Sequence, residues 1–211
     1  MKTIIFVAMS AFRIFLLSPA NSTGKRTDML LNSRATFERA FRIRNGGAPM
    51  GEVFSFLSGL YFRGKLAYAN QFARPHPGLT GVLIITSNRG LLPAETILTT
   101  EDLRSFSGVP IDASHDPYFR PLHESASRLS KELSLDSEIV LLGSISTGKY
   151  IDPLLEIFQS RLLFPEQFVG RGDMSRGGLL LRCADSRQEL QYIPVRGAVL
   201  HGKRPPKLER R

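Results

Sequence analysis

The chain has 211 residues, of which 42% are hydrophobic and 22% are charged, and its formal net charge is +9. This composition excludes a wholly disordered chain, and the length suits one domain with a sizeable core. Residues 196–211 contain six Lys or Arg and one Glu, a net of +5, so residues 1–195 carry the remaining +4. A basic tail on a mildly basic body favours polyanionic partners such as nucleic acid; a tail that only aids solubility is the alternative.

The cysteine content and the N-terminal residues indicate the cellular compartment in which the protein is expected. Cys183 is the single cysteine, so no disulfide can form within the chain, which is typical of a reducing compartment. Residues 1–13 begin with a basic residue and an apolar run that resembles a secretory signal, but Arg13 interrupts the run. We therefore predict a cytoplasmic protein in which residues 1–13 are an extension and Met9 is a possible true start; secretion is the alternative. No stretch reaches about 18 apolar residues, so no stable membrane association is expected.

The first part of the chain predicts strands alternating with helices. The apolar runs Ile14–Leu17 and Val53–Leu57 fit short buried strands, and Thr27 can cap a helix that runs to about Arg44. Gly46-Gly47 would end that helix.

A second helix is predicted over LYFRGKLAYANQF, directly after Ser58-Gly59, with Arg63 and Lys65 close to its start. Cations at a helix N-terminus oppose the helix dipole, and an anionic ligand would offset that cost. The run Gly81–Thr86 fits a third strand, followed by a small polar loop that contains Arg89. A short helix from about Thr100 and a longer one opening at Pro121 follow.

The stretch EIVLLGSISTGKY, at 138–150, combines a buried strand with a small polar loop. We expect a helix to open at Asp152-Pro153, so the loop would lie at a helix N-terminus, where backbone N–H groups bind anions. Gly143 and Gly148-Lys149 reproduce the spacing of a phosphate-binding loop, but Tyr150 stands where such loops place a magnesium ligand. The sequence therefore predicts phosphate contacts without a metal ion or other cofactor, from Ser144, Ser146, Thr147, Gly148 and Lys149. A plain connector with a solvated lysine is the alternative.

Ser-Thr-Gly-Lys, the end of this loop, also occurs at 22–25, after the first strand. The two copies could form two halves of one anion site or could be a coincidence.

The C-terminal part predicts a Gly- and Arg-rich loop, a hairpin and a tail. In PEQFVGRGDMSRGG, Arg171 and Arg176 could clamp an anion that the glycine backbone lets approach closely. Leu179–Cys183 and Glu189–Val195 alternate like the strands of an edge hairpin. Residues 197–211 are predicted to form a disordered basic tail.

Three stretches resemble a bacterial family of conserved proteins with no assigned function: SGLYFRGKLAYA at 58–69, the strand with SNRGLLP at 82–93, and FVGRGDMSRGGLLLRC at 168–183. The strand followed by Ser, Gly, Leu-Leu and Pro is also similar, more distantly, to the peroxide-stress protein YaaA and its relatives. The resemblance implies an α/β fold and a role near DNA or nucleotide chemistry. It carries no catalytic residue over to this chain.

The elements together predict a single α/β domain over 14–196, with a mainly parallel, Rossmann-like three-layer sheet and a C-terminal edge β-hairpin. In such sheets ligands bind beyond the carboxyl ends of the strands. A rim of cations is expected there: Lys25, Arg26, Arg63, Lys65, Arg89, Lys149, Arg171 and Arg176.

We expect this rim to bind nucleotide phosphates or a nucleic-acid backbone. An enzyme that processes nucleosides, nucleotides, DNA or RNA, of glycosidase or hydrolase type, is the alternative. Its acid or base would be Asp173 or Glu166, although a carboxylate among arginines is also the pattern of a structural ion pair. A secreted interaction protein that uses the Arg171-Gly172-Asp173 triplet is a third hypothesis.

Overall fold

The computed structural model describes residues 11–199, 202, 205–206 and 208, and its centre is a six-stranded sheet in the order β4-β3-β1-β6-β7-β8. The inner strands β1 (Arg13–Leu17), β3 (Val82–Ile85), β6 (Glu138–Leu142) and β7 (Leu162–Pro165) run parallel. At the edges, β4 (Leu91–Pro93) and β8 (Tyr192–Pro194) pair antiparallel.

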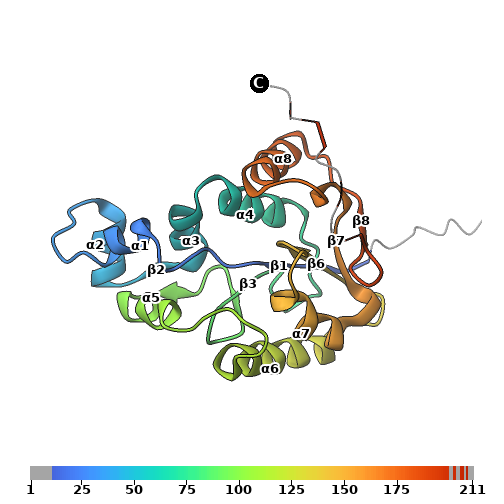
Figure 1. The fold of residues 1–211 in the computed structure, drawn as a ribbon, viewed down its shortest axis with the longest axis horizontal. Helices are drawn as coiled ribbons and strands as arrows, with labels where there is room; N and C mark the ends of the chain where they lie inside the picture. The colour runs from blue at the N-terminus through green and yellow to red at the C-terminus, as the bar shows by residue number, and fades with distance from the viewer. Residues whose placement is uncertain (1–10, 200–201, 203–204, 207, 209–211) are drawn as a thin grey trace, which may run out of the picture.

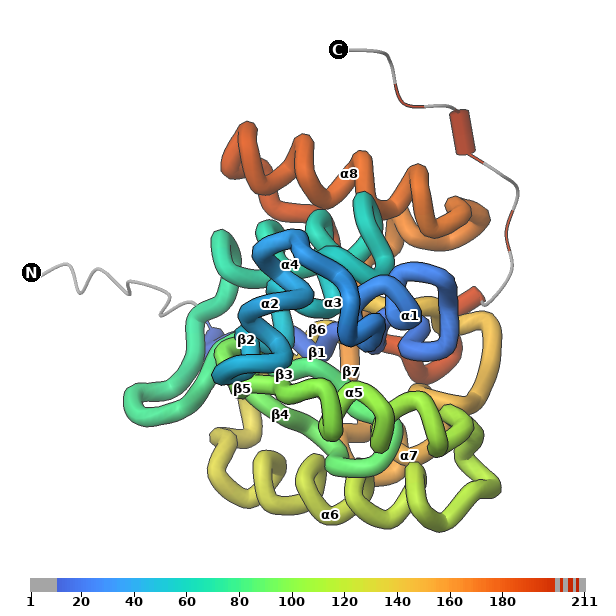
Figure 2. The backbone as a smooth tube through the Cα atoms, turned by 90° about the vertical axis from the view of Figure 1, so that its left-hand side faces the viewer, coloured from blue at the N-terminus to red at the C-terminus, as the bar shows by residue number. Residues whose placement is uncertain are grey.

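Helices cover both faces of the sheet (Figures 1 and 2). On one face lie α3 (Met50–Ser58), α4 (Leu60–Phe72) and α8 (Asp173–Ser186), and on the other lie α6 (Asp116–Glu132) and α7 (Gly148–Phe158). The expected α/β fold with a mainly parallel sheet is therefore confirmed. Short 3-10 turns, η1 (Gln159–Arg161) and η2 (Glu166–Phe168), flank β7.

The remaining elements gather at one end of the molecule, on the left of Figure 1: α1 (Lys25–Leu31), α2 (Glu38–Asn45), α5 (Thr100–Ser107) and a small antiparallel pair of β2 (Ala48–Pro49) with β5 (Ile97–Leu98).

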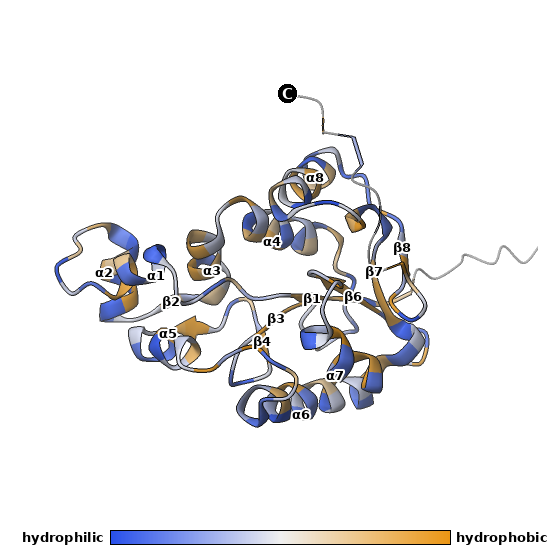
Figure 3. Ribbon diagram, viewed as in Figure 1, coloured by the Kyte–Doolittle hydropathy of each residue, from blue (hydrophilic) through white to orange (hydrophobic). Residues whose placement is uncertain are grey.

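The central strands are hydrophobic throughout because both of their faces are covered. Ile14 to Leu17 in β1 and Ile139 to Leu142 in β6 are all fully buried. Figure 3 shows these strands as hydrophobic, whereas the outer helices also carry strongly hydrophilic segments. A continuous apolar run is the expected signature of a parallel strand in a three-layer sheet.

The strand order reverses at β1. The chain passes from β1 to β3 on one side and then to β6 on the other side of β1. At such a switch point the connections leave the sheet toward opposite faces, and a crevice opens beyond the carboxyl ends of the two strands. The crevice expected for this protein therefore lies between the loops that follow Leu17 and Leu142.

Two predicted elements near the N-terminus are wrong. Val53–Leu57 lies in α3 and is not a strand; Val53, Phe54 and Leu57 are buried at helical spacing while Ser55 and Phe56 are half-exposed. A short apolar run fits a strand and a buried helix equally well, so the sequence pattern could not separate them. The helix expected from Thr27 to Arg44 is broken into two helices, α1 and α2. The N-cap of α1 is Gly24, and Thr27 lies inside that helix.

The C-terminal edge pair is formed by different segments from those predicted. Leu179–Cys183 belongs to α8, where Gly177, Leu180 and Cys183 face inward at helical spacing. The antiparallel edge pair is instead β7 with β8, and α8 lies between them in the chain. Pro194 does lie on an edge strand, as expected.

Both proline-containing helices start earlier than predicted. In α6, Pro121 is an interior residue, since the helix begins at Asp116. In α7, which begins at Gly148, Pro153 lacks the N–H that would bond the Lys149 carbonyl one turn before it. The Tyr118 hydroxyl donates to that carbonyl at 2.8 Å and replaces the missing donor. A tertiary contact from α6 thus satisfies the first turn of α7.

Few residues of the two predicted terminal segments are described. The N-terminal extension at 1–13 falls mainly on residues 1–10, outside the described residues. Of the described tail residues, Pro206 and Leu208 lie against α8: Arg171 Nη1 donates to the Pro206 carbonyl at 3.3 Å, and Leu208 lies near Gly178.

Candidate functional site

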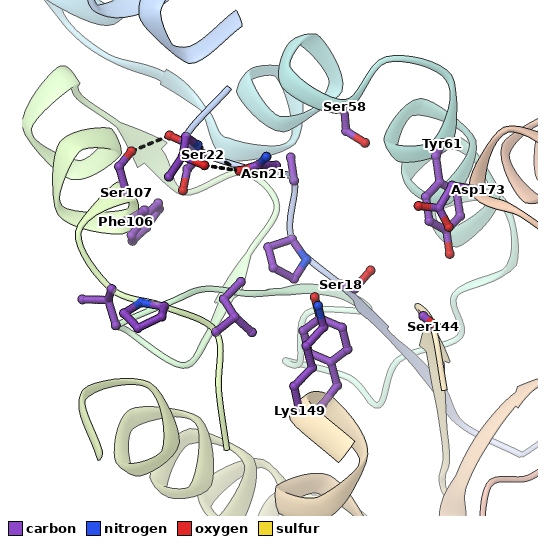
Figure 4. Close-up of a pocket in the computed structure, with 17 residues that line it drawn as sticks. Ser18, Asn21, Ser22, Ser58, Tyr61, Phe106, Ser107, Ser144, Lys149 and Asp173 are labelled. Carbon is purple, nitrogen blue, oxygen red and sulfur yellow. Dashed lines mark hydrogen bonds between the residues drawn. The ribbon is translucent and has the colours of Figure 1, made fainter. Parts of the chain in front are cut away.

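A cavity of about 640 Å³ opens at the switch point, beyond the carboxyl ends of β1 and β6 (Figure 4). Its walls come from the loops after these strands, the N-terminal ends of α4, α7 and α8, and the segment at the end of α5. The lining residues are Ser18, Pro19, Ala20, Asn21, Ser22, Thr23, Ser58, Tyr61, Phe106, Ser107, Val109, Pro110, Ile111, Ser144, Lys149, Tyr150 and Asp173.

The lining has an apolar side and many hydroxyl groups. Val109, Pro110 and Ile111 supply apolar surface from one segment, with the buried Phe106 ring beside them. Serine, threonine and tyrosine hydroxyls and the Asn21 amide line the remainder, and Ser107 brings one hydroxyl to the apolar segment itself. Within the described chain, Lys149 is the single cation in this lining and Asp173 is the single carboxylate.

The β1 loop is anchored by a buried lysine. Lys65 is 1% exposed, and its Nζ donates to the Ser18 carbonyl at 2.5 Å and to Ser18 Oγ at 2.9 Å. The same Nζ lies 4.5 Å from the centre of the Tyr61 ring and 4.7 Å from that of Phe62. Burial lowers the pKa of Lys65 to about 7, and the nearby Asp173 carboxylate only partly opposes that shift. Lys65 is thus part of the wall and does not line the cavity.

The two strand loops approach each other through a glycine. A Cβ on Gly143 would lie 2.9 Å from the Ser18 Cβ, so a larger residue would push the loops apart. Beyond Gly143, the Ser144 and Ser146 hydroxyls bond each other at 2.7 Å. Gly143 therefore holds the two loops close together, and Ser18 and Ser144 both line the cavity (Figure 4).

Lys149 reaches the cavity from the first turn of α7. It is the second residue of that helix, and its side chain extends into the cavity in Figure 4. Its Nζ lies 5.0 Å from the Tyr150 ring centre, and no carboxylate within the described residues pairs with it. Burial raises the pKa of the Tyr150 hydroxyl to about 12, so this neighbour stays neutral at physiological pH. The first turn of α7 thus offers one cation and unpaired backbone N–H groups to an anion.

The opposite wall depends on a close crossing of α4 and α8. A Cβ on Gly64 would lie 2.6 Å from the Gly177 carbonyl oxygen, and one on Gly177 would lie 2.7 Å from the Tyr61 Cα. Only glycine at both positions allows this approach. The crossing places Tyr61 of α4 beside Asp173, the first residue of α8 (Figure 4).

This wall carries an ion pair and a buried hydroxyl. Arg176 Nη1 lies 3.4 Å from Asp173 Oδ1, and its guanidinium also donates to the Phe168 carbonyl. The Tyr61 hydroxyl is buried and forms no hydrogen bond of normal geometry. Burial raises the pKa of Tyr61, and the neighbouring Arg176 guanidinium opposes that shift. A ligand in the cavity could satisfy this hydroxyl, because a buried polar group without a partner is costly.

Three of the residues proposed from the sequence line the cavity: Ser144, Lys149 and Asp173. Ser146, Thr147 and Gly148 belong to the same loop but are exposed outside the lining. Lys65 and Arg176 lie behind the wall. The loop at 144–149 and the N-terminal end of α8 therefore share one cavity, whereas the rim of eight cations does not form as expected.

The other proposed residues lie elsewhere. Arg89 forms an ion pair with Asp102 and lies over the Phe106 ring. Arg26 and Arg63 line a separate groove, and Lys25 is exposed on α1. Arg171 donates to backbone and hydroxyl oxygens near α8, and Glu166 is exposed in η2. Asp173 is therefore the proposed acid or base that the fold brings to the cavity.

Several lining residues were missed. Ser22 and Thr23 carried a signal, since they belong to the first copy of the Ser-Thr-Gly-Lys tetrapeptide, at 22–25. Tyr61 lies in a stretch singled out only for its cations. The segment at 106–111 gave no signal, because a mixed loop does not reveal which strand end it will cover.

Comparisons with protein-family models, with curated proteins and with solved structures each found no match to this chain. Within the described residues, no group of three or more His, Cys, Asp or Glu is placed to hold a metal ion. In that same part of the chain, no helix is both long and apolar enough to cross a membrane.

Proposed function

We propose that the cavity binds a nucleotide: a base against the apolar side, a sugar among the hydroxyls and a phosphate at Lys149. The observation that carries this proposal is the place of the cavity, at the strand-order reversal between β1 and β6, with a lone lysine in the first turn of the following helix. Doubly wound sheets bind nucleotides at this point of the fold.

The lining supports one mononucleotide better than a long polyanion. A volume of about 640 Å³ lies within the range of small-molecule pockets. One lysine with no carboxylate partner suits a single phosphate, whereas an extended backbone needs several cations. Val109, Pro110 and Ile111 offer the apolar surface that a base requires. The sequence resemblance, with its implied role near nucleotide chemistry, agrees with this proposal.

Calorimetric titration with AMP, GMP, CMP and UMP tests it. At least one monophosphate should bind saturably at one site, and its nucleoside should bind at least about tenfold more weakly, since the phosphate contact is lost. Binding of no monophosphate would overturn the proposal, as would equal affinity for nucleoside and nucleotide.

A second candidate is hydrolysis of the bound nucleotide at its N-glycosidic bond. Asp173 favours it, because this carboxylate lines the cavity beside the buried Tyr61 hydroxyl. As general base, Asp173 would take a proton from water as the water oxygen bonds C1′ and the bond from C1′ to the base breaks; Asp173 then returns that proton to the departing base. The test is chromatographic release of free base by wild type and Asp173→Asn; no release by wild type above the uncatalysed rate would exclude this activity.

A further inference from the structure

A second basic site adjoins the cavity. A groove of about 360 Å³ is lined by Arg26, Arg39 and Arg63, together with Phe56. Arg26 Nη1 donates to the Phe56 carbonyl at 2.9 Å, and the Arg39 guanidinium lies 5.4 Å from the Phe56 ring centre. Phe56 in turn stacks on Phe37 at 5.7 Å. The groove thus combines positive charge with an aromatic surface.

The charge of this groove is not balanced within the described residues. None of the three arginines has a carboxylate within 4.0 Å, and no acidic residue lines the groove. Glu52 on α3 is paired at 3.0 Å with Arg42, outside the groove, and Glu38 lies within a separate hollow beside Arg39 without pairing with it. Converging like charges repel each other, so an anion that contacts all three would be stabilised.

The groove and the cavity share a wall. Ser58 lines the cavity and the next residue, Gly59, lines the groove. Likewise Thr23 lines the cavity, and Arg26 lines the groove from the start of α1. Gly59 has a φ of +63°, and a Cβ there would lie 2.9 Å from Arg26 Nη1, so glycine lets this guanidinium lie directly on the junction of α3 and α4. The junction of α3 and α4 therefore lies between the groove and the cavity.

We propose that the basic groove binds the phosphodiester backbone that flanks the nucleotide in the cavity, so that the ligand is a single-stranded nucleic acid. This inference rests on the proposed function. Arginine with an aromatic platform is the usual surface for single strands, which leave each base free to turn into a pocket. The formal net charge of +9 would further raise the rate of encounter with such a strand.

The test compares two triple variants that lose the same charge. The groove variant carries Arg26→Gln, Arg39→Gln and Arg63→Gln. The control variant carries Arg128→Gln, Lys131→Gln and Arg196→Gln; these residues are exposed, and the two on α6 lie across the sheet from the groove. Fluorescence anisotropy measures binding of labelled single strands of about 15 nucleotides, as DNA and as RNA, against salt. Calorimetry measures the monophosphates on the same proteins, and circular dichroism confirms that they are folded.

The groove variant should bind the preferred strand about tenfold more weakly at low salt, and the slope of log affinity against log salt should fall by about 2, since each single-strand phosphate contact contributes about 0.7. Its affinity for monophosphates should equal that of wild type, and the control variant should match wild type throughout. The oligonucleotide that binds with the higher affinity, DNA or RNA, identifies the class of nucleic acid that the groove recognises.

Three results would overturn the inference. The first is an unchanged salt slope in the groove variant. The second is an equal loss of monophosphate affinity, which would make the arginines part of the nucleotide site. The third is a wild type that binds monophosphates but no strand, which would leave the proposed function standing. Binding of neither class would overturn both proposals.

Discussion

The tetrapeptide Ser-Thr-Gly-Lys follows two neighbouring strands, and only one copy brings its lysine to the cavity. After β1, Gly24 is the N-cap and Lys25 is the first residue of α1. After β6, Thr147 is the N-cap, so Lys149 is the second residue of α7. Because successive residues of an α-helix differ by about 100° around its axis, this shift of one residue turns the two lysines in different directions. Lys25 is exposed, whereas Lys149 lines the cavity.

The surroundings of each copy decide where its helix begins. In the first copy the Asn21 side chain accepts from the Thr23 N–H at 3.0 Å, a turn that delays the helix. In the second copy the Tyr118 hydroxyl bonds the Lys149 carbonyl, which lets α7 begin before Pro153. Identical residues thus differ in role because different neighbours satisfy their backbone groups.

The largest expected difference lies between the two lysines. Lys149→Ala should weaken binding of the preferred monophosphate about ten- to a hundredfold, or about 1.5–3 kcal/mol, the range of a charge-assisted hydrogen bond. Lys149→Arg should retain only part of the wild-type affinity for the monophosphate, since a planar guanidinium does not replace a compact ammonium. The matched control, Lys25→Ala, should bind as wild type does in calorimetry. If both variants bind equally well, the two copies do not differ in function.

A second test breaks the wall that faces Lys149. Gly177→Ala should lower the free energy of unfolding by about 1–3 kcal/mol, because its Cβ would meet backbone of α4 that cannot yield. Gly178→Ala is the matched control: its Cβ would make only an ordinary contact, 3.5 Å from Leu208 Cδ1, and alanine favours the helix. Urea denaturation measures both. Equal stability of the two variants would show that the glycine crossing does not constrain the wall.

A third test concerns Lys65, which anchors the loop before the first copy. Its pKa of about 7 in the folded protein lies below the value near 10.4 expected for an unfolded chain. Between these values the unfolded state binds more protons, so the stability contributed at this site rises with pH and is lowest below about pH 7. The Tyr61 ring, the Asp173 carboxylate and the Arg176 guanidinium lie near this amine. Burial raises the pKa of Tyr61, so its hydroxyl stays neutral over the same interval.

Relative to Lys65→Met, wild type should therefore gain stability from about pH 7 to pH 10, by at most about 1.4 kcal/mol per pH unit, the limit for one proton. Urea denaturation of both proteins across that range measures the difference. A difference that is constant or falls with pH would contradict a lowered pKa.

The smallest effect is expected from the basic tail, in which Leu208 lies near Gly178 of α8. Deleting residues 202–211 should change the free energy of unfolding by less than about 1 kcal/mol, because Leu208 is the main apolar residue lost. The salt slope for single-stranded nucleic acid should also fall, since the deletion removes cations. Thermal melting and anisotropy check the two expectations, and an unchanged slope would mean that the tail does not contact the strand.

The sequence by itself determined the sheet and the general place of the site. The continuous apolar runs of β1, β3 and β6 can be satisfied only between two layers of helices, so the α/β class followed from them. Parallel strands collect the loops after their carboxyl ends at one edge, which placed Ser144, Lys149 and Asp173 near a common cavity before the strand order was known.

Only the tertiary structure decided which cations meet and which do not. Whether Val53–Leu57 becomes a strand or a helix depends on what covers it, and the local pattern fits both. The start of α7 depends on a hydroxyl from α6, and the place of Tyr61 depends on two glycines more than a hundred residues apart, Gly64 and Gly177. Such contacts are set by packing between distant segments, and no local pattern of residues records them.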